Sequence, residues 1–146
     1  RVPLIIAGPG VSMGSSESHP VSLVDIYPTC LEFAQLDANG SFDGHSLLPF
    51  LTGSNEEWTG PEYSLSATAS TVSVAKNLPA PAREQHFSIR TEYFRYIRCR
   101  NGEEELYDHQ KDPHEWVNVA GQSNYLNTLA LMRNYFSEAT GITLLD

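Results

Sequence analysis

The N-terminal part of the chain carries three apolar patterns that predict three elements. Residues 2–7 form a short, nearly continuous apolar run, which is typical of a buried parallel strand. Apolar residues then recur at helical spacing and predict a helix over 22–35. We expect a kink or break of this helix at Tyr27, because the following Pro28 lacks a backbone donor. A short helix is expected over 44–51.

The C-terminal part alternates apolar and polar positions with a period of two, which predicts an antiparallel meander of three or four strands. Asn101-Gly102 is a strong signal for a two-residue hairpin turn, because both residues tolerate a positive φ angle. The expected strands cover residues 63–68, 86–91, 93–100 and 103–108.

A final helix over 124–139 should pack one face against this sheet, and Gly141 is placed as its C-terminal stop. Glu115–Val119 is expected to form a helical turn that directs Trp116 inward. Residues 69–85 are rich in Ala, Ser, Thr and Pro and predict a long, mobile loop. The apolar face of the final helix comprises Tyr125, Leu126, Leu129, Met132, Tyr135 and Phe136.

Charge and composition exclude two classes of protein. The 146 residues include 9 Lys+Arg and 18 Asp+Glu, which gives a formal net charge of −9. Because no basic cluster is present, we expect no nucleic-acid partner. No apolar run approaches the roughly 18 residues of a transmembrane helix, so we expect no membrane partner, and no signal peptide is visible. What remains is an acidic α+β chain without a self-sufficient catalytic motif.

One short segment gathers side chains of the kinds that bind metals: Asp108, His109, Asp112, His114 and Glu115. Their spacing contains no His-x₃-His, no cysteine pair and no regular loop of oxygen ligands. We therefore favour turn chemistry, in which the aspartates bond to the nearby backbone, over a metal site.

Two other sets of reactive side chains also have ordinary explanations. Glu103–Glu105 follow the predicted hairpin turn and should pair with Arg98 and Arg100 across the ladder, instead of forming a catalytic carboxylate pair. Cys30 and Cys99 fall on apolar faces and are expected to be buried small hydrophobes instead of nucleophiles.

His86 is the candidate for substrate contact. It follows the long predicted loop and opens the meander, and such junctions between loop and rigid sheet often present side chains to ligands. The alternative is a half-buried histidine at the end of a strand. We assign no catalytic and no metal-ligating residue in this chain.

Several phrases of the sequence, in this order, resemble the C-terminal part of a sulfatase of the alkaline-phosphatase-like superfamily, closest in character to the iduronate-2-sulfatase-like branch. They span nearly the whole chain: Arg1-Val2-Pro3-Leu4-Ile5-Ile6, the run from Val21 to Thr29, Asp43-Gly44-His45-Ser46-Leu47-Leu48-Pro49, the run from His86 to Ile97, and Glu105-Leu106-Tyr107-Asp108 followed by the run from Asp112 to Asn118.

The resemblance implies sulfate ester hydrolysis by a formylglycine residue and a calcium ion. The modification motif does not occur here, because Cys30 lies in a different context, Thr29-Cys30-Leu31. No pair of aspartates that could bind the metal opens the chain either. Both cofactors are therefore expected in a missing N-terminal part, and this chain alone is expected to be inactive. In this family, His86, and secondarily Arg90, could contact a sulfated carbohydrate or a small sulfate ester. Family habit favours a periplasmic, secreted or lysosomal location.

The expected fold is an α+β fragment of an alkaline-phosphatase-like α/β fold. Residues 1–60 would end the sulfatase core with one strand and its helices, and residues 61–146 would form a C-terminal subdomain. The missing N-terminal domain would be the main partner of the chain. Two alternatives stay open, namely a fragment of a related phosphate or phosphonate ester hydrolase, and a non-enzymatic interaction or carbohydrate-binding module.

Overall fold

The computed structural model describes residues 2–37, 40–69 and 85–142. The chain divides into two compact units, unit 1 (Arg1–Glu62) and unit 2 (Tyr63–Asp146). The sequence had suggested a boundary at 60/61. Among the described residues, no helix is both long and apolar enough to cross a bilayer.

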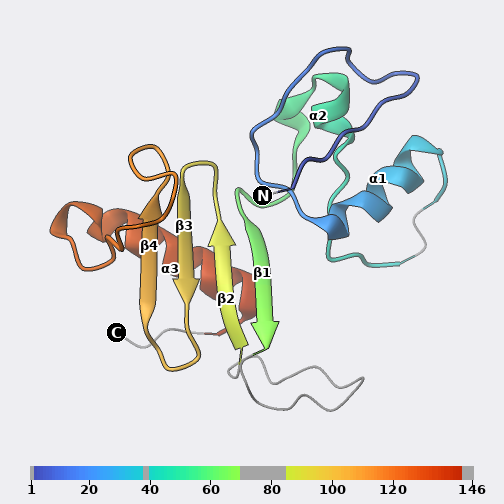
Figure 1. Ribbon diagram of the computed structural model, residues 1–146. Helices are drawn as coiled ribbons and strands as arrows, with labels where there is room; N and C mark the ends of the chain where they lie inside the picture. The colour runs from blue at the N-terminus through green and yellow to red at the C-terminus, as the bar shows by residue number, and fades with distance from the viewer. Residues whose placement is uncertain (1, 38–39, 70–84, 143–146) are drawn as a thin grey trace. The chain divides into compact units, whose positions relative to one another are not determined.

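Unit 2 contains a four-stranded antiparallel sheet in which every strand pairs with its neighbour in sequence (Figure 1). The strands are β1 (Ser64–Ala69), β2 (Gln85–Arg90), β3 (Phe94–Arg98) and β4 (Glu104–Asp108), in the order β1-β2-β3-β4. The predicted meander is confirmed, and residues 63–68 supply its fourth strand with a shift of one residue. The loop predicted at 69–85 falls almost wholly outside the described residues.

The turn between β3 and β4 differs from the predicted two-residue type. Arg98 and Glu104 are the last pair of the ladder, and the Gly102 amide donates to the Cys99 carbonyl at 3.0 Å. Only Gly102 has a positive φ, +92°, whereas Asn101 does not. This is the three-residue loop in which a glycine follows a tight turn and forms a bulge. The Asn101 side chain instead accepts a hydrogen bond from the Glu103 amide at 3.1 Å.

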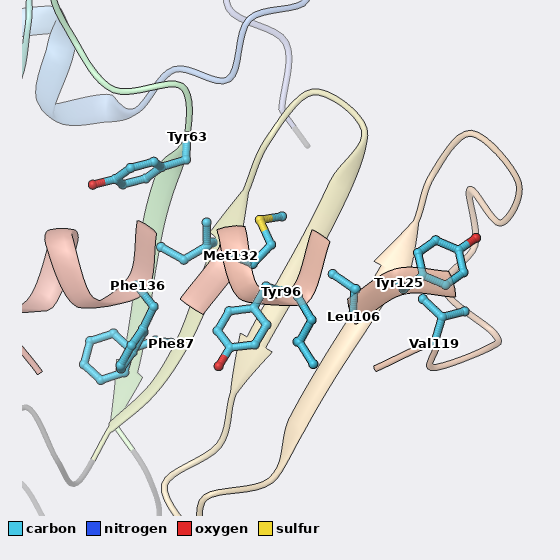
Figure 2. Packing of buried hydrophobic residues seen from close by; sticks show 10 residues of the cluster. Tyr63, Phe87, Tyr96, Leu106, Val119, Tyr125, Met132 and Phe136 are labelled. Atoms are coloured by element: carbon cyan, nitrogen blue, oxygen red, sulfur yellow. The ribbon is translucent and has the colours of Figure 1, made fainter. Parts of the chain in front are cut away.

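One face of the sheet packs against helix α3 (Leu126–Thr140), which follows the 3₁₀ turn η4 (Ser123–Tyr125) (Figure 1). Phe136 of α3 meets Phe87 of β2 edge to face, with ring centroids 5.4 Å apart. As predicted, the helix ends at Gly141, whose φ is +69°. Figure 2 shows this core, whose buried members are Tyr63, Phe87, Ile89, Tyr96, Leu106, Val119, Tyr125, Leu129, Met132 and Phe136.

Two apolar side chains expected inside unit 2 lie outside. Leu126 is 58% exposed, because the buried stripe of the helix runs through Tyr125 and Leu129 and leaves Leu126 at its flank. Trp116 is 82% exposed. The helical turn predicted at 115–119 does not form, since Glu115 has a φ of +60° and the backbone reverses there.

Unit 1 contains the 3₁₀ turn η1 (Leu23–Asp25) and the helices α1 (Ile26–Phe33) and α2 (Leu48–Thr52), then the 3₁₀ turn η2 (Asn55–Glu57). The interruption expected at Tyr27 lies earlier, where η1 passes into α1. Pro28 therefore sits in the first turn of α1, where a backbone amide has no helical partner to lose.

The structure differs from the prediction over residues 2–7. They have no regular secondary structure and form no ladder with any part of the chain that the structure describes. Val2 is 79% and Ile5 88% exposed. A buried parallel strand requires neighbouring strands to bond to and a layer to cover each face, and the described residues supply neither.

Candidate functional site

The face of the sheet opposite α3 is polar over β1 and β2 and carries the candidate His86. Phe87 and Ile89 of β2 point into the core, so the alternate residues of that strand lie on the other face. These alternate residues of β2 pair with β1 residues on one side and with β3 residues on the other. The pairs on this open face are Thr68 with His86, Ser66 with Ser88, Ser64 with Arg90, Arg90 with Arg95, and Ser88 with Ile97.

His86 lies at the start of β2 and is half-buried, next to the point where residues 70–84 join the strand. Its Nδ1 accepts a hydrogen bond of 3.5 Å from the Arg100 amide. A neutral imidazole that accepts at Nδ1 carries its proton on Nε2, and it can donate that proton to an oxygen anion. The structure thus places His86 where the sequence suggested, at the start of a strand of the meander.

Two arginines lie directly opposite each other on this face, Arg90 on β2 and Arg95 on β3. Like charges in that position repel, so each needs compensation. Nε of Arg95 lies 3.1 Å from Oε1 of Glu115, and Nη2 of Arg90 donates to the Glu92 carbonyl at 3.2 Å. The open face thus carries these two arginines together with His86.

The segment from Asp108 to Glu115, which contains the possible metal ligands, forms a loop that is held by ion pairs and hydrogen bonds. Oε1 of Glu115 is also 2.5 Å from Nε2 of His109, so one carboxylate joins two basic groups. Oδ2 of Asp112 accepts from the Val117 amide at 2.8 Å. Within the described ranges, no group of three or more His, Cys, Asp or Glu side chains is arranged to hold a metal ion.

Asp108 at the end of β4 is 4% exposed and satisfies its carboxylate locally. Oδ1 accepts from the Gln110 amide at 3.0 Å, and Oδ2 accepts from the Tyr125 hydroxyl at 2.8 Å and pairs with Nζ of Lys111 at 3.2 Å. Burial alone would raise the pKa of Asp108, but the bonds from Tyr125 and Lys111 outweigh it and hold the pKa below its usual value. The turn chemistry favoured for Asp108 and Asp112 is therefore what the structure contains.

Glu104 at the start of β4 is the centre of a network that joins two arginines and a tyrosine. Arg133 of α3 donates to both its oxygens, at 2.9 and 2.6 Å, and the Tyr96 hydroxyl donates to Oε1 at 2.5 Å. Arg98 lies across the ladder at 3.8 Å. Hydrogen bonding from Arg133 is the main cause that lowers the pKa of Glu104. The sequence suggested the Arg98 contact but missed Arg133, which lies 29 positions away.

Glu105 and the two cysteines are the other reactive side chains that the sequence singled out. Glu105 accepts from the Tyr107 hydroxyl at 2.8 Å, and burial together with this bond raises the pKa of Tyr107 to about 12. Cys99 is half-buried, and burial raises the pKa of its thiol, which disfavours the nucleophilic thiolate. The prediction that Cys30 is buried is wrong, because Cys30 is exposed on α1.

Sequence reasoning missed an aromatic cluster in unit 1. The Trp58 indole has three ring neighbours, with centroids 4.8 Å away for Phe50, 5.3 Å for His19 and 5.7 Å for His45. The Trp58 Nε1 donates to the Pro61 carbonyl at 3.3 Å, and Nε2 of His19 lies 3.1 Å from the same oxygen. No regular spacing connects these positions, so no periodic signal could have revealed them.

Comparison with known proteins identifies the family. The family described as N-sulphoglucosamine sulphohydrolase, C-terminal, matches residues 1–140. Arylsulfatase K of Xenopus laevis is 33% identical over 125 residues, which are 84% of this chain and 23% of that protein. The chain thus spans about a quarter of the length of this relative.

Solved structures agree with this result. A 2-O GAG sulfatase matches with a TM-score of 0.69 and 25% identity, over 91% of this chain and 29% of that one. A phosphonate monoester hydrolase from Silicibacter pomeroyi matches with a TM-score of 0.70 and 25% identity, over 90% of this chain and 27% of that one. The sheet and helix of unit 2 are therefore an α+β part of the sulfatase fold, and the chain belongs to the N-sulphoglucosamine sulphohydrolase C-terminal family of sulfatases.

Proposed function

We propose that this chain is the C-terminal segment of an enzyme that hydrolyses sulfate esters of a carbohydrate. The observation that carries the proposal is the match of the sulfatase C-terminal family to residues 1–140, together with arylsulfatase relatives at about one-third identity, such as the 33% of the Xenopus laevis protein. Catalysis would reside in the part of the longer protein that precedes this family segment.

Calcium and a formylglycine nucleophile, which the resemblance to sulfatases implies, do not fit the residues described here. No group of three His, Cys, Asp or Glu side chains in the described part can hold a metal, and Cys30 lies outside the modification context. We assign both cofactors to the rest of the longer protein. The role of this chain is to support that part and to contact the substrate.

The open face of unit 2 supports a role in substrate contact. His86 can donate from Nε2, and Ser88 and Arg90 follow it along the same strand and the same face. Hydroxyl and cationic donors in one row suit the hydroxyls and sulfate oxygens of a sulfated sugar, because charge-assisted hydrogen bonds to oxyanions are the strong ones. His86 stands at the edge of the row and is the residue that we propose touches the ester.

The apolar surface of unit 1 supports the proposed partner, which is the N-terminal sulfatase domain. Val2, Ile5 and Leu23 are 79%, 88% and 74% exposed, although they belong to the apolar runs that predicted buried elements. Exposed apolar surface of this extent marks an interaction site. We propose that the rest of the sulfatase covers it.

The test uses the full-length protein that carries this segment and an aryl sulfate as a chromogenic substrate. We expect hydrolysis that His86→Ala reduces through KM more than through kcat, since His86 would bind and not react. Asn134→Ala is the control, because Asn134 is exposed on α3, the helix that covers the other face of the sheet, and should leave both constants within about twofold. Full activity of His86→Ala would remove His86 from the site, and absence of sulfate hydrolysis would refute the function.

A second candidate follows from one observation, the similarity to the phosphonate monoester hydrolase from Silicibacter pomeroyi. The same full-length protein would then cleave a phosphonate monoester faster than the aryl sulfate. Comparison of kcat/KM for the two esters, with the same aryl leaving group, decides between these activities.

A further inference from the structure

The segment between β4 and η4 presents an aromatic pair to solvent. Trp116 is 82% exposed, and its ring stacks on that of His114 with centroids 5.0 Å apart and an angle of 26° between the planes. The next residue, Val117, is 54% exposed. An exposed indole of this size, next to a second exposed apolar side chain, is unusual on a protein surface and marks a place of contact.

The backbone that carries this pair is fixed in place. Glu115 has a φ of +60°, which non-glycine residues rarely adopt, and its carboxylate is tied to both Arg95 and His109. Asp112 holds the Val117 amide at 2.8 Å on the other side of Trp116. A strained backbone and three polar contacts thus hold the loop in an arrangement that keeps Trp116 in solvent. This arrangement points to a surface prepared for a ligand.

Glu115, which stands between His114 and Trp116 in the sequence, contacts the open face of the sheet. The carboxylate of Glu115, the residue before Trp116, lies against Arg95, which stands opposite Arg90 on the open face. From Arg90 to His86 is four residues along β2, about 13 Å at the rise of a strand. This separation exceeds one sugar ring, so a ligand that reaches from His86 to Trp116 must contain several sugar units.

We propose that Trp116 and His114 form a stacking platform for a sugar ring of a carbohydrate chain, several units away from the sugar whose sulfate is removed. The chemistry is the packing of the apolar C–H face of a pyranose on the indole ring, a contact that needs no particular sulfation pattern. The proposal rests on the proposed function, since it names an additional contact for the same carbohydrate substrate. The platform should matter for long substrates and not for short ones.

The experiment compares long and short ligands on the full-length protein. The probes are octasaccharides and disaccharides of heparin, chondroitin sulfate and carrageenan, and an aryl sulfate reports the basal activity. We expect Trp116→Ala to weaken binding of at least one octasaccharide about fivefold or more, as one aromatic contact would. Binding of the disaccharides and turnover of the aryl sulfate should stay within about twofold, and Trp116→Phe should restore part of the loss.

Tyr93→Ala is the matched control, because Tyr93 is an exposed aromatic residue of unit 2, 45% exposed, at the β2–β3 turn. It should change none of these constants. The proposal is overturned if Trp116→Ala leaves every octasaccharide unaffected, or if it weakens long and short ligands equally. A fall of several degrees in the Tm of the full-length Trp116→Ala protein would also overturn it, since the ring would then pack against the rest of the enzyme. Failure of wild type to release sulfate from any of the oligosaccharides or from the aryl sulfate would refute the proposed function alone, because binding of octasaccharides is measured separately.

Discussion

Unit 1 and unit 2 are similar in hydrophobic content but differ in what they bury. Ten apolar residues of unit 2 pack into one core, in which Ile89, Tyr96 and Leu106 are fully inaccessible to solvent. In unit 1, Leu47 is the one buried apolar side chain among the described residues. Large apolar side chains on its surface are Val2, Leu4, Ile5, Met13, Leu23, Val24, Tyr27 and Leu36.

The difference lies in where each pattern finds its partners. Every strand of unit 2 pairs with its neighbour in sequence, and α3 follows at once to cover the sheet. Residues 2–7 have the composition of a strand buried on both faces, which can be satisfied only by strands and helices outside the described residues. Local patterns thus determine unit 2, whereas the apolar pattern of residues 2–7 finds no pairing strand among the described residues of either unit.

The largest expected effect is in the core of unit 2. Phe136 is 2% exposed and contacts the rings of both Phe87 and Tyr96. Phe136→Ala should lower the free energy of unfolding by about 3–5 kcal/mol, through lost burial and the cavity that remains. Urea denaturation of the chain measures this value. Ile5→Ala in unit 1 is the control and should change it by less than about 0.5 kcal/mol.

The Glu104 network should follow in size. Glu104→Gln keeps the shape of the side chain but removes the charge that binds Arg133, and should cost about 1.5–3 kcal/mol. The lower part of that range is favoured, since the Arg133 side chain is 40% exposed and solvent screens the pair. Equilibrium unfolding at neutral pH provides the measurement, and a loss below about 0.5 kcal/mol would show that the network adds nothing.

The same network predicts how stability depends on pH. The pKa of Glu104 is lowered in the folded state, so its contribution is fully present above the unfolded pKa of about 4.3. It is lost as the pH falls through the folded pKa. The gap in stability between wild type and Glu104→Gln should therefore be constant near neutral pH and narrow in acid. A gap that persists unchanged into acid would contradict this assignment.

In unit 1 the largest effect should come from a buried polar group and not from apolar packing. Asp25 is 6% exposed, and its carboxylate accepts from the Ser22 amide at 2.6 Å and the His45 amide at 2.9 Å. Asp25→Ala leaves both amides without their acceptor and should cost about 1–3 kcal/mol locally. Hydrogen exchange of the His45 amide should accelerate, while exchange in β3 stays unchanged. Asp25→Asn, which keeps one acceptor, should fall in between.

The sequence was sufficient wherever an element and its partner are near neighbours. The meander, the final helix and its stop at Gly141 follow from alternation, helical spacing and one glycine. It was insufficient where groups far apart in the sequence form a contact, as Arg133 and Glu104 do. It was also insufficient where one strained residue changes the direction of the chain, as Glu115 does before Trp116. His86 could be placed at the start of a strand from the sequence. Its neighbours on the open face required the register between strands.

A smaller effect is expected at the turn between β3 and β4. Gly102 has a φ of +92°, and a Cβ added there would find ordinary space, with the closest Arg98 atom at 3.6 Å. Gly102→Ala should therefore cost only the backbone strain of the left-handed region, about 1–2 kcal/mol. Unfolding in urea gives the magnitude. Asn101→Gly is a useful counterpart, because Asn101 has no positive φ to relieve and loses one side-chain bond at most.

The smallest effect should come from Leu126, the residue that helical spacing placed on the wrong side. Leu126 is 58% exposed, whereas Leu129, one turn later, is 5% exposed. Leu126→Gln should change the free energy of unfolding by less than about 0.5 kcal/mol, as surface substitutions do. Leu129→Gln places an amide in the core and should destabilise unit 2 by several times as much. If the two substitutions had equal cost, Leu126 would be covered by another surface. Unit 2 would then depend on contacts outside the described residues.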